Sequence, residues 1–320
     1  MKNKGTICII GGSGFVGHHL AAKLSVAGWQ LRIPTRRPER HRDLGVLPDV
    51  QLIEADIHDA KTLRDLFSGC TAVINLVGIL NEKGHKGRGF RHAHVELTEK
   101  LLAACSTQGV PRLLHMSALN ADAREAKSHY LRTKGEAENL VHAAATQGLH
   151  VTSFRPSVIF GPGDSFFNRF GALLKSIPLA FPLACPEALF APVYVGDVAA
   201  AFVTALATPA TVGQRYVLCG PTRYTLRQLV EYTARTLGLH RHIIGLSPAL
   251  SSLQSRVFEY VPGKPFSRDN YWSLQKHSVC NAPFPAVFGI TPSSIEAIVP
   301  SYLANHTQRS QYDEFRKMKG

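Results

Sequence analysis

The chain has few cysteines, and none of them stands in a metal-binding pattern. The six cysteines are scattered without the CxxC or Cys/His spacings that build zinc sites, and the fifteen histidines contain no HExxH pairing. We therefore predict no metal site and expect His18 and His19 to be packed or solvated. Most of the cysteines are expected to be small buried hydrophobes in a reducing compartment.

Long apolar runs and targeting patterns are also missing. The longest apolar stretch, residues 177–193, is broken by Pro178, Pro182 and Glu187 and cannot form one spanning helix. The chain enters a strand-like segment at Ile7 without the basic and apolar parts of a signal peptide. We expect a cytoplasmic protein, with peripheral contact at the inner face of the membrane left open.

Acidic residues are the minority charge. The sequence has 36 Lys and Arg against 23 Asp and Glu, a net charge of +13, which suits phosphorylated ligands, anionic membranes and polyanions. The basic residues are densest at 36–42 and 83–91, and aromatic residues are not interleaved with either cluster. This pattern disfavours a single-strand nucleic-acid groove, so we predict no nucleic-acid partner.

Strand-like and helix-like segments alternate through the first half of the chain. Strands are predicted over 6–11, 30–35, 50–54, 72–77, 112–117 and 151–155, and helices over 16–27, 60–68, 93–107 and 130–147. Such an alternation predicts an α/β protein with a doubly wound parallel sheet, the Rossmann fold.

The regular alternation ends near residue 163, where Gly-Pro-Gly introduces Phe-rich and Pro-rich stretches. We predict a Rossmann domain over residues 1–163, to which 193–220 returns, and a smaller mixed substrate-type domain over 164–320 with a loose tail from about 305. Asp197 is expected to cap a helix over 198–207. The apolar stretches 166–193 and 246–262 are expected to form the core of the small domain, with a hydrophobic pocket or docking surface as the alternative.

A glycine-rich loop joins the first predicted strand to the first helix. Gly11 allows a tight turn, Gly14 lets a pyrophosphate approach the backbone, and Gly17 lets helix and sheet pack closely. The helix N-terminus adds amide donors for the phosphates. We predict a dinucleotide site that includes Gly11, Ser13, Gly14, Phe15, Val16 and Gly17.

The residues after the second strand discriminate between dinucleotides. An NAD site usually has an acidic residue there that accepts a hydrogen bond from the ribose 2′-hydroxyl. Here Thr35 is followed by Arg36 and Arg37, whose guanidinium groups suit a 2′-phosphate. We predict NADP(H) rather than NAD(H), with Asp56 and Ile57 beside the adenine. The alternatives are a solvated basic loop for the arginines and an ordinary helix cap for Asp56.

Three further residues suit proton chemistry. Ser117 ends the strand predicted over 112–117, and Tyr130 and Lys134 lie one turn apart on the following helix. An ammonium group near a phenol favours the phenolate, and a serine hydroxyl can orient a substrate oxygen. We predict that Ser117, Tyr130 and Lys134 are catalytic, the alternative being that the tyrosine and lysine are surface side chains.

Several motifs together resemble one superfamily. They are residues 11–17, Ile-Asn-Leu-Val-Gly at 74–78, His-Met-Ser-Ala-Leu at 115–119, Tyr-Leu-Arg-Thr-Lys at 130–134, Arg-Pro-Ser-Val-Ile-Phe-Gly at 155–161 and Val-Tyr-Val-Gly-Asp-Val-Ala at 193–199. The chain resembles the atypical and extended short-chain dehydrogenases/reductases from residue 6 to about 220. More closely, it is similar to the nucleotide-binding accessory subunit of respiratory complex I and its bacterial relatives, which residues 265–302 also resemble.

The resemblance implies roles for particular residues. NADP(H) would lie along 11–17, Arg36, Arg37, Asp56, Ile57, Leu76, Val77, Gly78, Tyr130, Lys134, Pro156, Ser157, Val158 and Ile159. In catalytic relatives Tyr130 would be the acid/base, Lys134 would bind the nicotinamide ribose and acidify the tyrosine, and Ser117 would steady the substrate carbonyl. His94 stands near a position where the superfamily often has Asn, which fits either a proton relay or a site that kept its cofactor and lost turnover.

Three functions remain open at this stage. The first is an NADP(H)-preferring oxidoreductase linked to complex I or ubiquinone metabolism, with a hydrophobic quinone-like substrate. The alternative is a non-catalytic NADPH-binding accessory or assembly factor of a respiratory or quinone-biosynthetic complex, because a ligand that binds only the native state stabilises it. The third is an NAD-dependent sugar-nucleotide epimerase or dehydratase. The basic loop 83–91 is expected to be solvated, with cofactor cover or anionic membrane contact as alternatives.

Overall fold

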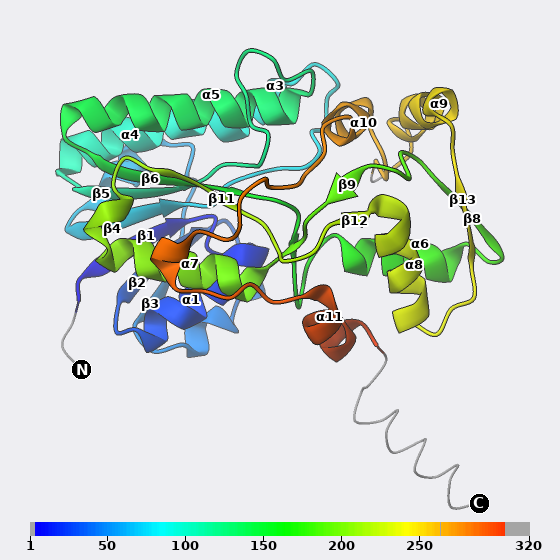
Figure 1. The fold of residues 1–320 in the computed structure, drawn as a ribbon. Coiled ribbons are helices and arrows are strands. Elements are labelled where there is room, and N and C mark those ends of the chain that lie inside the picture. Colours follow the sequence, from blue (N-terminus) through cyan, green and yellow to red (C-terminus); the bar gives the residue numbers. More distant parts are fainter. Residues whose placement is uncertain (1–3, 263, 305–320) are drawn as a thin grey trace, which may run out of the picture.

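A seven-stranded parallel sheet forms the centre of the N-terminal part of the molecule (Figure 1). The computed structural model describes residues 4–262 and 264–304. The strand order is β11-β6-β5-β4-β1-β2-β3, and every neighbouring pair is parallel. The strands are β1 (Thr6–Ile10), β2 (Gln30–Thr35), β3 (Val50–Glu54), β4 (Cys70–Asn75), β5 (Arg112–Met116), β6 (His150–Pro156) and β11 (Arg215–Leu218). The predicted doubly wound fold is confirmed.

Helices cover both faces of this sheet, which explains why the central strands β1 and β4 are mostly apolar. Ile7 and Ile9 of β1 pack into the core beneath α1 (Phe15–Val26) and α7 (Val195–Ala207). Their neighbours Cys8 and Ile10 point into the opposite core. That core lies under α2 (Ala60–Phe67), α4 (Leu97–Gln108) and α5 (His129–Ala144). In Figure 1, α4 and α5 run above the sheet and α1 and α7 below it.

The chain returns to the sheet after residue 193, where α7 packs on α1 and β11 extends the edge beside β6. The prediction that Asp197 caps this helix is wrong. Helix α7 begins at Val195, so Asp197 lies within its first turn and its carboxylate instead accepts a hydrogen bond of 2.7 Å from the Ser293 amide. The side chain therefore fastens a distant C-terminal segment to α7.

The helix predicted over 93–107 begins with a π-helical turn. This turn, η3 (His92–Glu96), follows the short α3 (Arg88–Arg91) and precedes α4. The Thr98 hydroxyl, in the first turn of α4, donates to the carbonyl oxygen of His94 at 2.6 Å. Turns of the π-helical kind are frequent at functional sites, and this one directs the His94 side chain to the segment that follows β4.

The remaining elements build a smaller region with a separate core, on the right of Figure 1. Its strands pair only in twos: β7 (Ile159–Phe160) with β10 (Val193–Tyr194), β8 (Ala180–Leu183) with β13 (His242–Gly245), and β9 (Leu189–Phe190) with β12 (Tyr224–Thr225). Its helices are α6 (Phe167–Ser176), α8 (Leu226–Thr236), α9 (Pro248–Phe258), α10 (Arg268–Leu274) and α11 (Ile295–Leu303). Short 3-10 turns lie at Pro38–Arg40, Leu44–Val46, Ala145–Gln147, Pro209–Thr211 and Ala286–Phe288.

Within the described ranges, no helix has the length and apolar character needed to cross a membrane. The tail predicted from about residue 305 lies outside the described residues.

The cysteines depart in part from the expectation. Cys8, Cys70 and Cys105 are buried thiols, as expected, and Cys185 is partly buried. Cys219 and Cys280, however, form a disulfide that joins the end of β11 to the segment before residue 281. The expectation of free, reduced cysteines is therefore wrong for this pair. Nothing in the spacing revealed it, because the two residues lie 61 positions apart.

Candidate functional site

The glycine loop lies between the carboxyl ends of β1 and β4 and the start of α1. Gly11 has a φ of +80°, and a Cβ there would lie 3.2 Å from the Leu76 backbone. A Cβ on Gly17 would lie 2.2 Å from a carbonyl oxygen of the loop, so the helix can begin this close only with glycine. Gly14 caps α1, is exposed, and has only one loop carbonyl oxygen near its Cβ position. The loop thus leaves room for a phosphate at a helix start that lacks acidic side chains.

The first turn of α1 has polar neighbours on its outer side. His18 Nδ1 lies 2.8 Å from the Gly14 carbonyl oxygen, and His18 Nε2 pairs with Asp43 at 3.1 Å. One ligand atom each of His18, His41 and Asp43 lies within 4.8 Å of the others. The prediction that the chain has no metal site remains a prediction.

Three side chains fix the segment after β4 that is expected to contact the cofactor. Asn75 Oδ1 accepts a hydrogen bond of 3.1 Å from the Val77 amide. Lys134 Nζ donates to the Val77 carbonyl oxygen at 2.9 Å, and His94 Nε2 accepts from the Ile79 amide at 3.2 Å. The predicted cofactor residues Leu76–Gly78 are therefore held in place by groups from β4, η3 and α5.

His94 is buried, and both ring nitrogens have partners. Because Nε2 accepts from an amide, the proton lies on Nδ1, which is 2.8 Å from the Thr133 hydroxyl oxygen. Burial, followed by the charge of Lys134, lowers the pKa of His94 to about 2. The ring is neutral and positions the backbone after β4, so it is unsuited to relay protons.

Lys134 lies inside α5 with its ammonium group at the ends of β4 and β5. Nζ donates to the carbonyl oxygens of Val77 and Met116, each at 2.9 Å. A Cβ on Gly78 would lie 3.1 Å from Nζ, so a side chain at that position would crowd the lysine. Burial lowers the pKa of Lys134 to about 8, with Glu138 opposing this shift. The lysine borders the cofactor segment 76–78 that the family resemblance implies.

Tyr130 lies on the first turn of α5 and is partly buried. Its ring stands edge-on to His94 and Phe90, with centroids 5.7 and 6.1 Å apart. Its hydroxyl makes no hydrogen bond with any residue that the structure describes. Burial, and then the charge of Asp269, raises the pKa of Tyr130 to about 12. This direction is opposite to the acidification that the family resemblance implies.

The Ser117 hydroxyl is hydrogen-bonded to a buried carboxylate on α5. Ser117 is buried after β5, and its Oγ donates to Glu138 Oε2 at 3.1 Å. The same carboxylate accepts from Arg155 at 2.8 Å and lies 3.6 Å from Arg215. Glu138 has no exposed surface, so Ser117 belongs to a buried polar network under α5. The only sequence feature that could have pointed to Glu138 is its position one helical turn beyond Lys134.

Arg36 and Arg37 stand exposed at the carboxyl end of β2, beside the glycine loop. Their side chains form no ion pair within the described residues, so both guanidinium groups are available to an anion. Asp56, after β3, is not the cap of α2, because that role belongs to Asp59. Its Oδ1 accepts from the His58 amide at 2.9 Å, which shapes the loop next to Ile57.

The segment after β6 is fastened to the C-terminal region. Ser157 Oγ donates to the Ser278 carbonyl oxygen at 2.7 Å, and the Val158 carbonyl oxygen accepts from the Val193 amide at 2.9 Å. Cys280, which forms the disulfide, lies two residues beyond Ser278. The predicted cofactor residues Pro156–Ile159 therefore lie in a segment that is hydrogen-bonded to residues 278 and 193, and the disulfide anchors the chain near residue 278.

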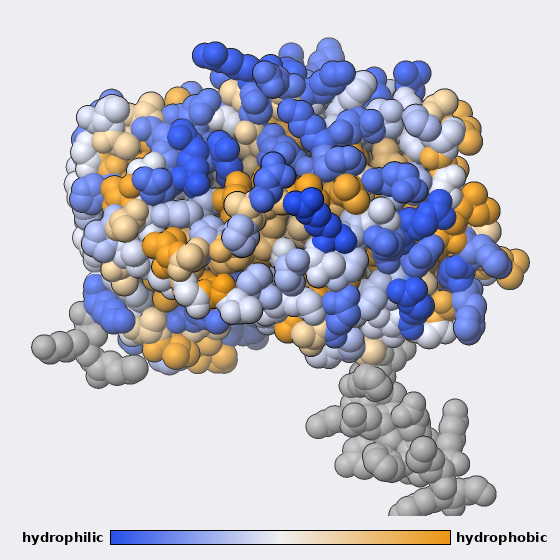
Figure 2. All heavy atoms as spheres, viewed as in Figure 1, coloured by the Kyte–Doolittle hydropathy of each residue, from blue (hydrophilic) through white to orange (hydrophobic). Residues whose placement is uncertain are grey.

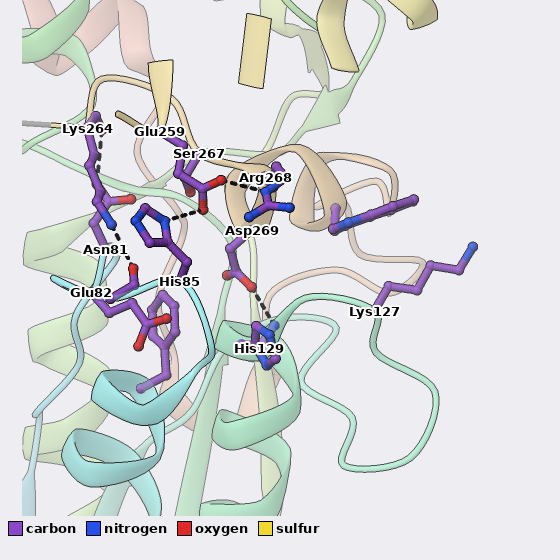
Figure 3. A pocket seen from close by; sticks show the side chains of 13 residues that line it. Asn81, Glu82, His85, Lys127, His129, Glu259, Lys264, Ser267, Arg268 and Asp269 are labelled. Atoms are coloured by element: carbon purple, nitrogen blue, oxygen red, sulfur yellow. Dashed lines mark hydrogen bonds and ion pairs between the residues drawn. The ribbon is translucent and has the colours of Figure 1, made fainter. Parts of the chain in front are cut away.

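Sequence reasoning missed Asp269 at the start of α10. Its carboxylate accepts hydrogen bonds from the His129 amide and, at 3.2 Å, from the Tyr130 amide, so it occupies the positive end of α5. Asp269 also lines a pocket of about 180 Å³ between α5, α10 and the 81–90 loop (Figure 3). The family resemblance covered residues 265–271 but assigned Asp269 no role, and no local spacing links it to Tyr130.

The comparisons with known proteins show the family and the fold. The model of the NAD dependent epimerase/dehydratase family matches residues 7–219, and the chain belongs to this family, the extended and atypical short-chain dehydrogenases. A structure of UDP-glucuronic acid 4-epimerase from Bacillus cereus with UDP-glucuronic acid and NAD shares the fold, with a TM-score of 0.68 and 18% identity, over 93% of this chain and 98% of that one.

Two curated relatives span most of the chain. The mitochondrial NADH dehydrogenase [ubiquinone] 1 alpha subcomplex subunit 9 of Mus musculus is 28% identical over 308 residues, 93% of this chain and 79% of that protein. The ceramide reductase of Caulobacter vibrioides is 28% identical over 247 residues, 76% of this chain and 74% of that protein. The chain is thus an NAD(P)-binding protein of the atypical short-chain dehydrogenase class, related to a complex I subunit.

Proposed function

We propose that the protein holds NADP(H) as a resident part of its structure and serves as an accessory or assembly factor of a respiratory or quinone-biosynthetic complex. The observation that carries this proposal is the hydrogen bond from Ser117 to the buried Glu138. This bond occupies the Ser117 hydroxyl, which a reductase of this class would use to orient the carbonyl group of its substrate. The relationship to a complex I subunit supports the accessory role.

The residues fit the dinucleotide in three places. Gly14 leaves a pyrophosphate space at the start of α1, and Arg36 and Arg37 offer two unpaired guanidinium groups to a 2′-phosphate. Lys134 and the segment 76–78 border the place where the nicotinamide ribose would lie. In the proposed complex with NADP(H), these groups bind and orient the dinucleotide. The arginines account for the proposed preference for NADP(H) over NAD(H).

The groups expected to move protons are poorly prepared for it. Lys134 donates to two backbone carbonyl oxygens, and burial raises the pKa of Tyr130 to about 12, so the phenol stays protonated at neutral pH. His94 is neutral with both nitrogens engaged. A phenol with so high a pKa is a weak proton donor and is almost never the phenolate base at neutral pH, which favours a retained dinucleotide over rapid turnover.

Purification under native conditions tests this proposal. Protein prepared without added nucleotide should release NADP(H) on denaturation, and adding NADPH to stripped protein should raise the thermal unfolding midpoint by mass action. NADP(H) that no quinone or carbonyl compound oxidises supports the accessory role. Protein that arrives empty and oxidises NADPH steadily with one compound class contradicts it.

A reductase of a lipid-tailed carbonyl or quinone-like compound is the second candidate, and the free Tyr130 hydroxyl favours it. The protonated phenol could donate its proton to a carbonyl oxygen, while bound NADPH would supply the hydride. Two relatives bear reductase names, ceramide reductase and a ketoreductase of a farnesylated quinoline oxide. Sugar-nucleotide epimerisation is less favoured, because Arg36 and Arg37 stand where an NAD site usually has a carboxylate.

A further inference from the structure

Helix α9 (Pro248–Phe258) has its polar side inside and its apolar side outside. Ser251 and Ser255 are each only 1% exposed, whereas Leu250, Leu253 and Val257 are 51%, 55% and 54% exposed. A helix on the surface of a globular protein normally has the opposite pattern. The expectation that residues 246–262 form the core of the small domain is therefore wrong for this helix.

Both buried serines form hydrogen bonds within the protein. Ser251 Oγ accepts from the Cys185 amide at 3.1 Å, and Ser255 Oγ donates to the Ser252 carbonyl oxygen at 2.7 Å. Ser251 thus attaches the polar face of α9 to the segment at Cys185, while the Ser255 bond stays within the helix, and the leucines and valine lie on the outer side. Tyr260 and Val261, just beyond the helix, are 73% and 40% exposed and extend the apolar surface. We call Leu250, Leu253, Val257, Tyr260 and Val261 the α9 face.

The α9 face lies at the upper right edge of the molecule, where Figure 2 shows apolar side chains gathered over the helix that Figure 1 labels. Contiguous exposed apolar surface of this kind usually marks an interaction site. An interfacial amphipathic helix needs in addition basic groups beside its apolar side.

Basic side chains stand beside the α9 face. The 83–88 loop packs against the end of α9, because the His85 and Tyr260 rings lie 5.1 Å apart and Lys264 Nζ donates to the Gly84 carbonyl oxygen at 2.7 Å. The loop exposes Lys83, Lys86 and Arg88, and α9 exposes Arg256. None of these four side chains forms an ion pair within the described residues.

The carboxylates of the same region are occupied internally. Glu82 accepts from the Gly87 and Gly89 amides at 2.6 and 2.7 Å. Glu259 pairs with His85 and Arg268, as Figure 3 shows, and Asp269 binds the start of α5. Positive charge without an ion-pair partner among the described residues therefore borders the α9 face, while the nearby carboxylates are engaged by backbone amides, His85 and Arg268. This complementarity fits an anionic lipid surface.

We propose that the α9 face and the basic 83–88 loop dock the protein onto an anionic membrane leaflet. The leucines, valine and Tyr260 enter the boundary between headgroups and acyl chains, and Lys83, Lys86 and Arg88 contact the lipid phosphates. The proposal is independent of cofactor binding. Docking in this way would place the pocket that Asp269 lines close to the bilayer surface. Two of its lining residues adjoin the α9 face: Glu259 caps the end of α9, and the His85 ring packs on Tyr260.

Flotation of the full chain with vesicles tests this proposal. The protein should float with equimolar phosphatidylcholine and phosphatidylglycerol at low salt, and less with phosphatidylcholine alone. L253S/V257S should abolish flotation, and K83Q/K86Q should lower partitioning roughly fivefold per lysine and flatten its salt dependence. These exposed positions tolerate substitution without unfolding. V46S in an exposed turn and K61Q on α2 are the matched controls, and both should float like the parent.

Two outcomes would overturn the proposal. One is a parent protein that stays at the bottom of the gradient with anionic vesicles. The other is a parent that sediments as a dimer, fails to float and becomes monomeric with L253S/V257S, which would make the α9 face a contact between two copies. Emission from Trp272, which is 40% exposed on α10, gives a second readout, because it should shift to shorter wavelength when vesicles are added.

Discussion

The Ser117 hydroxyl and the Glu138 carboxylate are joined by a hydrogen bond of 3.1 Å beneath α5. Glu138 has no exposed surface and also binds Arg155. A buried carboxylate needs such partners, because leaving it unpaired costs several kcal/mol. The serine that ends β5 thus acts within the protein interior, although its place in the sequence suggested substrate contact.

Replacing Ser117 with Ala separates these two roles. We expect S117A to lower the free energy of unfolding by about 1–3 kcal/mol, because Glu138 loses one donor but keeps Arg155. NADPH affinity should stay within about twofold, since the hydroxyl does not contact the predicted cofactor residues. Urea unfolding and fluorescence titration measure both quantities, with S106A on the exposed side of α4 as the control. Unchanged stability together with lost NADPH oxidation would restore the catalytic role.

The arginines after β2 determine cofactor preference in our account. R36A/R37A should weaken NADPH binding roughly tenfold to a hundredfold and leave NADH binding nearly unchanged, because only NADPH has the 2′-phosphate that they pair with. R40A/R42A, which removes two exposed arginines from the same loop, is the matched control. Equal losses of affinity for both dinucleotides would eliminate the 2′-phosphate argument.

Tyr130 distinguishes the two candidate functions. Under the accessory hypothesis Y130F leaves NADPH binding within about threefold and fully complements a deletion strain, because the hydroxyl forms no hydrogen bond within the described structure. A reductase would lose turnover while retaining the cofactor. Growth and membrane-complex assembly of the complemented strain are the measurements, and a null phenotype with intact NADPH binding would favour the reductase.

His94 contributes a defined acid sensitivity. Its folded pKa of about 2 lies below the unfolded value of about 6.5, so the unfolded state binds a proton that the folded state does not as the pH falls below about 6.5. Stability then decreases by up to about 1.4 kcal/mol per pH unit from this group alone. Urea unfolding between about pH 7 and pH 5 should show a shallower decrease for H94N than for the parent. The control H240N, at an exposed histidine, should follow the parent, and an unchanged slope in H94N would refute the neutral buried ring.

The disulfide should be measurable in the purified protein. Thiol titration of the denatured, unreduced chain should find four free cysteines and one Cys219–Cys280 link. C280S should lower the free energy of unfolding by up to about 4 kcal/mol, the chain-entropy value for a loop of this length. C185S, which removes a partly buried free thiol, is the control and should have a smaller effect. Six free thiols in protein purified without reductant would contradict the link.

The sequence allowed the sheet and the dinucleotide loop to be predicted because their signals are local. The predicted bounds of β2 and β3 match the structure, since the turn residues Gly28 and Pro48 mark the breaks before these strands. Asp269 could not be predicted, because it meets the start of α5 from 139 residues away. The reversed polarity of α9 was also hidden, since Leu250, Leu253 and Val257 have the spacing of an ordinary core stripe.

The direct test of the central claim is mass spectrometry of small molecules released from freshly purified protein, alongside NADPH fluorescence with a panel of quinone and carbonyl compounds. Our account predicts co-purified NADP(H) whose fluorescence no compound diminishes beyond the background rate. Empty protein that consumes added NADPH with one class of compound would contradict it and identify an enzyme.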